Sequence, residues 1–355
     1  MTPKERLLTT LRLKVPDRVP MDLTGFNREA FRLFKEKTGS DNPAEYFGAE
    51  YDYGWVGFKG SKIDPKMYAR FHKNLPEGAR FNEWGTAFVV GSNPAFDHFI
   101  APLTDVKSIE EFKDYPLPDF TAEYRHKHLE EEVSRIHQQG LAAIGGMACT
   151  IFEVSWQIRG FNELLTDFLI RREYAEALLD RITELSCFRA RRFAEAGVDI
   201  IHIGDDVGME HKTMMSRDLW WEWLGSRLSK VIESARQVKP DVLFYYHSDG
   251  YVEPFIPDFI NIGIDCLNPV QPECMDPAKL KQKYGDRLAF WGTIGIQTTM
   301  PFGTPEDVRR EVKERIGTVG RGGGLVIGPT HAIEPEVPLE NIFAFVNAVK
   351  EYGKY

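Results

Sequence analysis

A histidine and a carboxylate two residues apart follow a short apolar run in the second half of the chain. Residues 243–246 are apolar or aromatic, and His247 and Asp249 come directly after them, followed by Gly250. This pattern indicates a buried strand that ends in a loop. Side chains two residues apart on a strand point to the same side, so His247 and Asp249 could converge on one metal ion or one substrate group. Alternatively, Asp249 and Gly250 form an ordinary turn and His247 is a hydrogen-bonded residue at a strand end.

A second histidine, His331, lies in a loop that prolines on both sides stiffen. His247 and His331 with a carboxylate from Asp249 or Asp206 would form a two-histidine, one-carboxylate site with an open position. We therefore predict a zinc site of His247, Asp249 and His331, and catalytic roles for Asp206, His247 and His331. Zinc there would act as a Lewis acid toward a substrate heteroatom. Without a metal, the same groups form a polar pocket in which His331 acts as a general acid or binds an anion.

Further polar and aromatic residues follow other expected strands, and we predict that they bind substrate: Glu153, Asp205, Asn268, Gln271 and Trp84. Each has a structural alternative. Asp205 and Asp206 are adjacent, so at most one of them enters the site and the other could cap a helix. Glu153 could be an exposed residue of a helical turn, and Trp84 could serve ordinary packing. His202, inside an apolar strand, is predicted to be a core histidine.

These side chains need a scaffold that brings many strand ends together. From about residue 120 onward, helical segments alternate with short apolar runs, which is typical of a parallel sheet. Helices are expected at 2–13, 161–169, 172–195 and 218–238, and strands at 19–22, 88–90, 142–146, 199–204, 242–247, 264–268, 288–292 and 325–328. Eight strands predict an α/β fold, a single (β/α)₈ TIM barrel over residues 1–355 with its active site at the carboxyl ends of the strands. Residues 42–124 lack a sustained helical period and are predicted to form an insertion or lid over that end.

Composition excludes several classes of partner. The chain has 355 residues and a net charge of −9, and its basic residues form no block, so nucleic acid and anionic membrane surfaces are not expected partners. The N-terminal stretch lacks the apolar core of a signal peptide or membrane span, so a cytoplasmic location is expected. Four cysteines without a CxxC pair indicate reduced thiols rather than a disulfide framework.

The chain resembles the uroporphyrinogen decarboxylase superfamily, including its corrinoid and coenzyme M methyltransferases, over most of its length and most strongly from residue 197 to the end. The resemblance is carried by His247 with residues 254–257, 263–265, 268–272, 275–277, 290–292, 301–305 and 322–331. The N-terminal arginine-rich signature of the decarboxylases is missing from residues 22–28. The methyltransferases bind zinc through a His-x-Cys pair and a later Cys; His247 matches the histidine, Asp249 stands at the first cysteine, and His331 falls near the second. Oxygen and nitrogen ligands suit activation of an ether, phenolic or carboxylate oxygen rather than a thiol.

The resemblance leads to a ranked set of functions. The first is a methyltransferase that moves a methyl group between a small methylated substrate, an O-methyl compound, and a corrinoid on a separate protein. A separate protein is expected because the chain contains no DxHxxG cobalamin-binding pattern. The second is a cofactor-free decarboxylase of an acidic substrate, and the third is a non-catalytic binding barrel. Whether a metal binds, the direction of transfer and the formation of a homodimer are left open.

Overall fold

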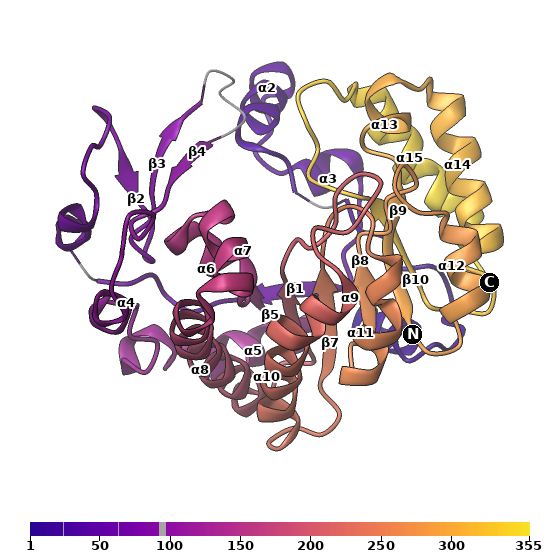
Figure 1. Ribbon diagram of the computed structural model, residues 1–355. Coiled ribbons are helices and arrows are strands. Elements are labelled where there is room, and N and C mark those ends of the chain that lie inside the picture. The colour runs from indigo at the N-terminus through magenta and orange to yellow at the C-terminus, as the bar shows by residue number, and fades with distance from the viewer. Residues whose placement is uncertain (24, 63, 92–96) are drawn as a thin grey trace.

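A parallel sheet of seven strands organises the structure, a computed structural model that describes residues 1–23, 25–62, 64–91 and 97–355 (Figure 1). The strands follow one another in the order β1-β5-β6-β7-β8-β9-β10, and each pairs in parallel with its neighbours. Their bounds are β1 (Tyr53–Val56), β5 (Ala142–Ala148), β6 (Ile200–Gly204), β7 (Leu243–His247), β8 (Cys266–Asn268), β9 (Ala289–Ile294) and β10 (Leu325–Pro329). The six predicted strands from residue 142 onward are therefore confirmed.

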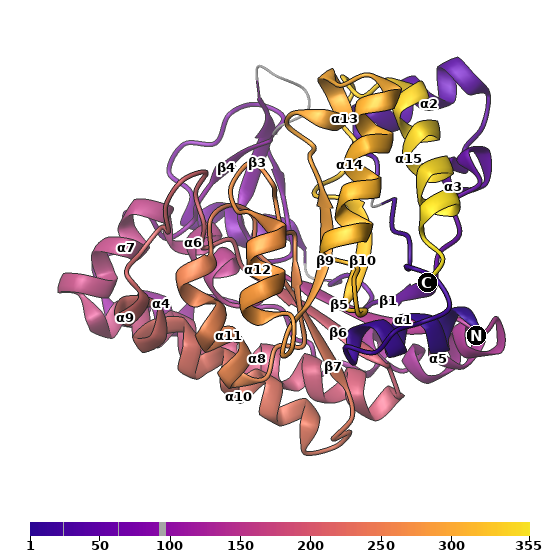
Figure 2. The same cartoon turned by 90° about the vertical axis from the view of Figure 1, so that its right-hand side faces the viewer.

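Helices connect the strands and cover the outer side of the curled sheet (Figure 2). They are α1 (Pro3–Leu11), α2 (Arg28–Thr38), α3 (Pro43–Phe47), α4 (Ile109–Asp114), α5 (Leu129–Gln138), α6 (Phe152–Arg159), α7 (Phe161–Ile170), α8 (Arg172–Ala196), α9 (Arg217–Trp220), α10 (Ser226–Arg236), α11 (Ile256–Ile262), α12 (Pro277–Tyr284), α13 (Thr299–Phe302), α14 (Pro305–Thr318) and α15 (Leu339–Tyr352), with the short turns η1 (Pro65–Phe71), η2 (Glu123–Arg125), η3 (Trp221–Gly225) and η4 (Glu253–Phe255). Across the described part of the chain, every helix is too short or too polar to cross a bilayer.

The first strand position differs from the prediction. Residues 20–22 lie beside β10 and form a single parallel bridge, Met21 to Ile327, with Asp22 N donating to Ile327 O at 2.8 Å. The predicted barrel strand near residues 88–90 is wrong, because that segment belongs to β3 (Ala87–Val90) in an antiparallel sheet with β2 (Arg80–Phe81) and β4 (Asp97–Ile100). The sheet is instead extended by β1, whose four residues are too short to show a period in the sequence.

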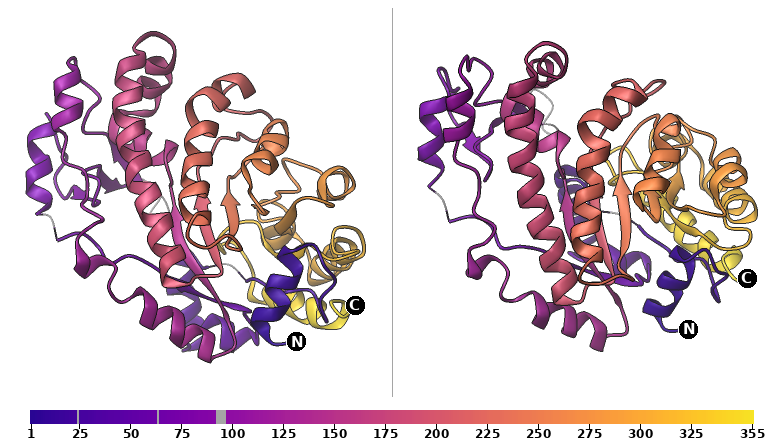
Figure 3. Two further views of the ribbon diagram at one scale, coloured as in Figure 1. Left: turned by 90° about the horizontal axis from the view of Figure 1, so that it is seen from below. Right: turned by 60° about the horizontal axis from the view of Figure 1, so that its bottom comes forward.

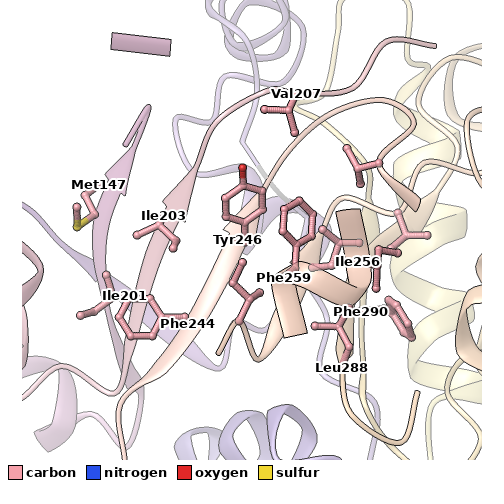
Figure 4. Packing of buried hydrophobic residues seen from close by; sticks show 14 of the residues in the cluster. Met147, Ile201, Ile203, Val207, Phe244, Tyr246, Ile256, Phe259, Leu288 and Phe290 are labelled. Carbon is pink, nitrogen blue, oxygen red and sulfur yellow. The ribbon is translucent and has the colours of Figure 1, made fainter. Parts of the chain in front are cut away.

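Both faces of the sheet are apolar, as expected for parallel strands that are covered on both sides. Residues at one parity point outward and pack against the helices, as Ile201, Phe244 and Tyr246 do in Figure 4, where Phe259 of α11 lies against Tyr246. Residues at the other parity fill the concave side: Ala142, Ile144, Ile200, Leu243, Tyr245, Cys266, Ala289, Trp291 and Val326. We call this concave side the interior. Period-two alternation therefore separates the two faces along every strand.

Helix α1 closes the interior at the amino ends of the strands (Figure 3). Its residues Leu7 and Leu11 belong to the same buried cluster as the interior strand residues. The helix begins with Thr2 as N-cap and Pro3 at its first position, and Glu5 completes a capping box. Interior residues are therefore accessible from the carboxyl ends of the strands.

Close packing of β5 on α8 provides a test of this fold. A Cβ atom at Gly145 would lie 2.6 Å from Cγ of the fully buried Phe193. We expect Gly145→Ala to lower the free energy of unfolding by about 1–3 kcal/mol, because the core must shift to make room. Urea titration measures this. Gly317→Ala, on the exposed side of α14 with no atom within 4 Å of the new methyl group, is the matched control and should be neutral or stabilising. An unchanged Gly145→Ala protein would contradict the close approach.

Candidate metal centre at the carboxyl ends of β6 and β7

The alternation of β6 decides which of two adjacent aspartates enters the interior. Ile200 and His202 are interior residues, whereas Ile201 and Ile203 pack outward. Continued past the strand end, this parity directs Asp206 to the interior side and Asp205 to the outer side. The structure agrees: Asp206 lies beside His247, and Asp205 is fully buried against α6.

Three side chains form a compact group at this end of the sheet. His247 Nε2 lies 3.9 Å from Asp206 Oδ1 and 3.9 Å from Asp249 Oδ1. Their potential ligand atoms all lie within 4.8 Å of one another. The backbone of Asp249 also donates to Asp206 Oδ1 at 2.8 Å, which holds the two loops together. Asp249 Oδ1 is buried, and among the described residues it has no hydrogen-bond partner. A cation among these atoms would satisfy that oxygen.

Asn268 sets the orientation of the His247 ring. The Asn268 amide donates to Trp291 O at 3.3 Å, so its carbonyl oxygen faces His247 Nδ1 at 2.6 Å. Nδ1 must therefore carry the proton, and in the neutral ring Nε2 presents its lone pair to two carboxylates. Such an arrangement is repulsive unless Nε2 takes up a second proton or a metal ion. A hydrogen bond from the distant ring nitrogen is also the usual support of a metal-binding histidine.

His331 approaches the group from the other side. Its Nε2 lies 3.8 Å from Asp249 Oδ2, and its side chain is 47% exposed on the loop after β10. Asp249 therefore stands between the two histidines, one at each oxygen. The compact group differs from the predicted ligand set of His247, Asp249 and His331 in its third member, which is Asp206. The reason is the short backbone hydrogen bond between the β6 and β7 loops, which no sequence pattern reveals.

Two of the residues predicted to bind substrate instead have positioning contacts within the protein. Gln271 is buried, and its Oε1 accepts a hydrogen bond from Gly250 N at 2.5 Å, which supports the loop that carries Asp249. Asn268 is buried and engaged with His247. Both residues thus support His247 and the loop of Asp249 from behind, and their predicted contact with substrate stays a prediction.

Asp205 is a helix cap. It accepts hydrogen bonds from Ile151 N at 3.0 Å and from Glu153 N at 2.9 Å, at the start of α6. The capping alternative is therefore the one that the structure supports, although the capped helix is not the next one in the chain. Burial raises the pKa of Asp205 to about 7, while the backbone N–H groups lower it. Through this cap, Asp205 positions Glu153.

Glu153 lies against Asp206. Its Oε2 accepts a hydrogen bond from Asp206 N at 3.3 Å. Burial raises the pKa of Glu153 to about 8, and repulsion from Asp206 and Asp205 adds to the effect. Burial also raises the pKa of Asp249, while the nearby His247 lowers it. The site therefore gathers more carboxylates than its histidines neutralise, and Glu153 holds a proton near neutral pH.

Two tryptophans differ in their access to the interior. Trp84 was predicted to contact substrate, but it is buried with Phe120 and Tyr115, and the Tyr115 hydroxyl donates to its carbonyl at 2.5 Å. Trp55 was not predicted at all, yet it lies on β1 with its ring 5.4 Å from that of His202. The run of residues 53–56 was the one available signal, and it is too short to separate a strand from a loop.

Sequence comparisons match the chain to a known protein family. The family model described as uroporphyrinogen decarboxylase (URO-D) matches residues 85–352. The methylcobamide:CoM methyltransferase MtaA of Methanosarcina barkeri is 33% identical over 177 residues, which cover 50% of this chain and 49% of that protein. The chain thus spans about half the length of this relative. A uroporphyrinogen decarboxylase of Pseudomonas syringae pv. syringae is 22% identical over 275 residues, covering 75% of this chain and 73% of its own length.

The fold has a solved counterpart. A methyltransferase from Methanosarcina mazei superposes with a TM-score of 0.68 over 99% of both chains, at 21% sequence identity. At this identity the match establishes the α/β architecture with its curled parallel sheet, and leaves the chemistry to be argued from the site.

The different roles of the two adjacent aspartates can be separated by stability. Asp205→Ala leaves two backbone N–H groups of α6 without an acceptor, so we expect a loss of about 1–3 kcal/mol in the free energy of unfolding. Asp206→Ala, at a side chain that is 34% exposed, removes one acceptor, that of Asp249 N, and should cost less than Asp205→Ala, about 1 kcal/mol. Thermal or urea unfolding of both variants decides the assignment. Equal losses would argue against the cap.

The raised pKa of Glu153 predicts that the stability of the metal-free protein depends on pH. Its folded pKa of about 8 exceeds the ordinary 4.5, so the folded state binds this proton more tightly than the unfolded state. Its stabilising contribution is complete below about pH 4.5 and is lost as the pH rises toward 8. Glu153→Gln should flatten that decline in urea titrations run across this range. Glu184→Gln, on the exposed side of α8, is the control and should leave the slope unchanged. An identical decline in Glu153→Gln would assign the pH dependence to another group.

Proposed function

The chain belongs to the uroporphyrinogen decarboxylase family, and from this premise we propose that it is a methyltransferase that moves a methyl group between a small methylated substrate and a corrinoid on a separate protein. The similarity to the methylcobamide:CoM methyltransferase supports the reaction type, because the name of that relative describes a methyltransferase with a methylated corrinoid (methylcobamide) as one reactant. The observation that carries the proposal is the group of Asp206, His247 and Asp249, which presents three metal-binding atoms around one point.

These residues fit a zinc ion after a small side-chain adjustment. His247 Nε2 and the unpartnered Asp249 Oδ1 lie 3.9 Å apart, and tetrahedral zinc ligands with bonds of about 2 Å lie about 3.3 Å apart. Asp206 would be the third ligand, and the fourth position would be open to substrate. Bound there, zinc supplies Lewis acidity toward a substrate heteroatom.

The donor set favours an oxygen substrate. None of the four cysteines, all of them in the described part of the chain, joins the group. Nitrogen and carboxylate ligands leave the metal harder than thiolates do, which suits an ether or phenolic oxygen. We therefore propose an O-methyl compound as methyl donor and demethylation as the direction of transfer.

In that direction the bonds balance without a further reactant. The bond between the methyl carbon and the substrate oxygen breaks, and cobalt(I) of the corrinoid supplies the electron pair of the new bond to carbon. The oxygen takes up one proton, and the products are the methylated corrinoid and a free hydroxyl compound. Glu153, protonated near neutral pH and hydrogen-bonded to Asp206, is the proposed source of that proton.

We also propose that residues 20–22 complete a closed (β/α)₈ barrel and that part of the region 42–124 acts as a lid. Asp22 supports closure, because it accepts from Tyr53 OH on β1 at 2.8 Å and from Trp291 Nε1 on β9 at 2.6 Å. The small sheet β2–β4 is tied to α6 by the hydrogen bond from Thr86 Oγ1 to Gln157 O at 2.9 Å. It thereby contacts the helix that presents Glu153.

Decarboxylation is the second candidate, since the uroporphyrinogen decarboxylase of Pseudomonas syringae aligns with 75% of this chain and the methyltransferase MtaA with 50%. Two assays separate the candidates. Incubation of the protein with cob(I)alamin and a methoxylated compound should give the absorbance change of methylcobalamin. Release of carbon dioxide from uroporphyrinogen, without any methyl transfer, would reverse the assignment.

Metal content and methyl transfer should be lost together. We expect His247→Ala and Asp206→Ala to purify folded with about one equivalent of zinc less than the wild-type protein, and without methyl transfer, because each removes one of three ligands. His331→Ala should keep its zinc and lose activity only in part. His211→Ala, at an exposed histidine outside the site, is the control and should keep both. Elemental analysis and the cobalamin assay provide the measurements. Full activity after dialysis against a chelator would exclude the zinc role.

A further inference from the structure

A half-exposed tryptophan lines the interior next to the metal-binding group. Trp55 pairs in register with Ile144 of β5 and shares its face of β1 with Tyr53. Its ring lies over the glycine at position 146, where a Cβ atom would be 3.6 Å from it. The residue is nevertheless 49% exposed, which is unusual for a large apolar side chain on the inner face of a sheet. Exposed aromatic surface inside a site is available to a ligand.

A continuous wall leads from Trp55 to the candidate metal centre. The His202 ring lies 5.4 Å from the indole and 6.1 Å from the His247 ring, which it meets at 83°. His202 Nε2 is buried and lacks a hydrogen-bond partner among the described residues. A ligand on Trp55 therefore sits one imidazole away from the group that would activate its methyl substituent.

Two carboxylates disfavour an anionic ligand at the metal-free site. Within the described ranges, the ion-pair partners of Asp206 and Asp249 are histidines alone. Without a metal ion, a carboxylate or phosphate on a ligand would therefore meet like charge here, and a neutral or cationic ligand is favoured.

The aromatic geometry favours a flat neutral ring over a quaternary ammonium ion. An ammonium cage needs several aromatic faces around one point. Among the described interior aromatic residues with ring contacts here, Tyr53 is partly buried, and Tyr245 and Trp291 are 6% and 1% exposed. Trp55, at 49% exposure, presents the largest free surface of these residues. A single exposed indole face is suited to offset stacking with another aromatic ring.

We propose that Trp55 is the stacking platform for the substrate ring and that the methyl donor is an uncharged aryl methyl ether. The proposal rests on the methyl transfer proposed above, and it adds the substrate class and the residue that selects it. The His202 ring lies between Trp55 and His247 and extends the aromatic wall toward the candidate metal centre. The ether oxygen then points along the wall toward His247.

Binding tests the platform without any methyl transfer. Isothermal titration of the intact protein with methoxybenzene should give saturable binding, and methoxycyclohexane, which has the same ether oxygen but no flat π face, should bind more weakly. Trp55→Leu should weaken methoxybenzene binding about tenfold and leave methoxycyclohexane unchanged, whereas Trp55→Phe should retain most of the affinity. Trp221→Leu, at a tryptophan that is 44% exposed on the outer helices, is the matched control and should bind like wild type.

Each other outcome has a definite meaning. Equal methoxybenzene affinity in the wild-type and Trp55→Leu proteins would overturn the platform. Tighter binding of tetramethylammonium than of methoxybenzene, lost in Trp55→Leu, would overturn the aryl ether class. Trp55-dependent binding of methoxybenzene without any change in the cob(I)alamin spectrum would overturn the proposed methyl transfer and support the aromatic site.

Discussion

The strict alternation of side chains along a β-strand is the constraint on which this site depends. It sends Asp206 to the interior and Asp205 to the helices, although the two are neighbours in the chain. The same rule continues through β7 and brings His247 and then Asp249 to the interior side. Because neighbouring parallel strands end at the same edge, these residues meet at one point. A shift of one residue in β6 would exchange the capping and the metal-binding aspartate, and a shift of one residue in β7 would turn His247 and Asp249 away from the interior.

A site built in this way accumulates negative charge that the protein itself does not cancel. Burial and mutual repulsion raise the pKa values of Glu153 and Asp249. Asn268 fixes the proton of His247 on the far nitrogen, so the near nitrogen adds a lone pair to the same space. Such an arrangement is costly for an isolated protein and is characteristic of functional sites, where a cation or a substrate proton offsets it. The uncompensated negative charge of the centre therefore indicates that it binds a cation or a substrate proton.

Support from behind the centre is as specific as the centre itself. Gln271 holds the loop of Asp249, Asp205 holds the helix of Glu153, and Asp22 joins β1 to β9 across the interior. None of these carboxylates or amides needs to touch a substrate, yet each one sets the position of a residue that would. The polar residues at the strand ends thus form two layers, and only the inner layer faces the space where chemistry would occur.

The sequence by itself determined most of the scaffold and the identity of the central pair. Apolar runs alternating with helical periods predicted the six strands from residue 142 onward and the helices between them, because burial on both faces leaves a strong local pattern. His247 and Asp249 were found by their spacing, and the family was found from its motifs. Local pattern did not suffice at β1, whose four residues carry no readable period, or at β3, where it predicted a strand but not the sheet to which that strand belongs.

Only the tertiary structure decided the partners. It placed Asp206 rather than His331 in the compact group, gave Asp205 to a helix that precedes it in the chain, and brought Trp55 from a region without a clear pattern to the wall of the site. These outcomes depend on which strands lie side by side and on hydrogen bonds between loops that are distant in the sequence. A sequence pattern reports the environment that a residue prefers, whereas the neighbours that it meets are set by the closure of the sheet.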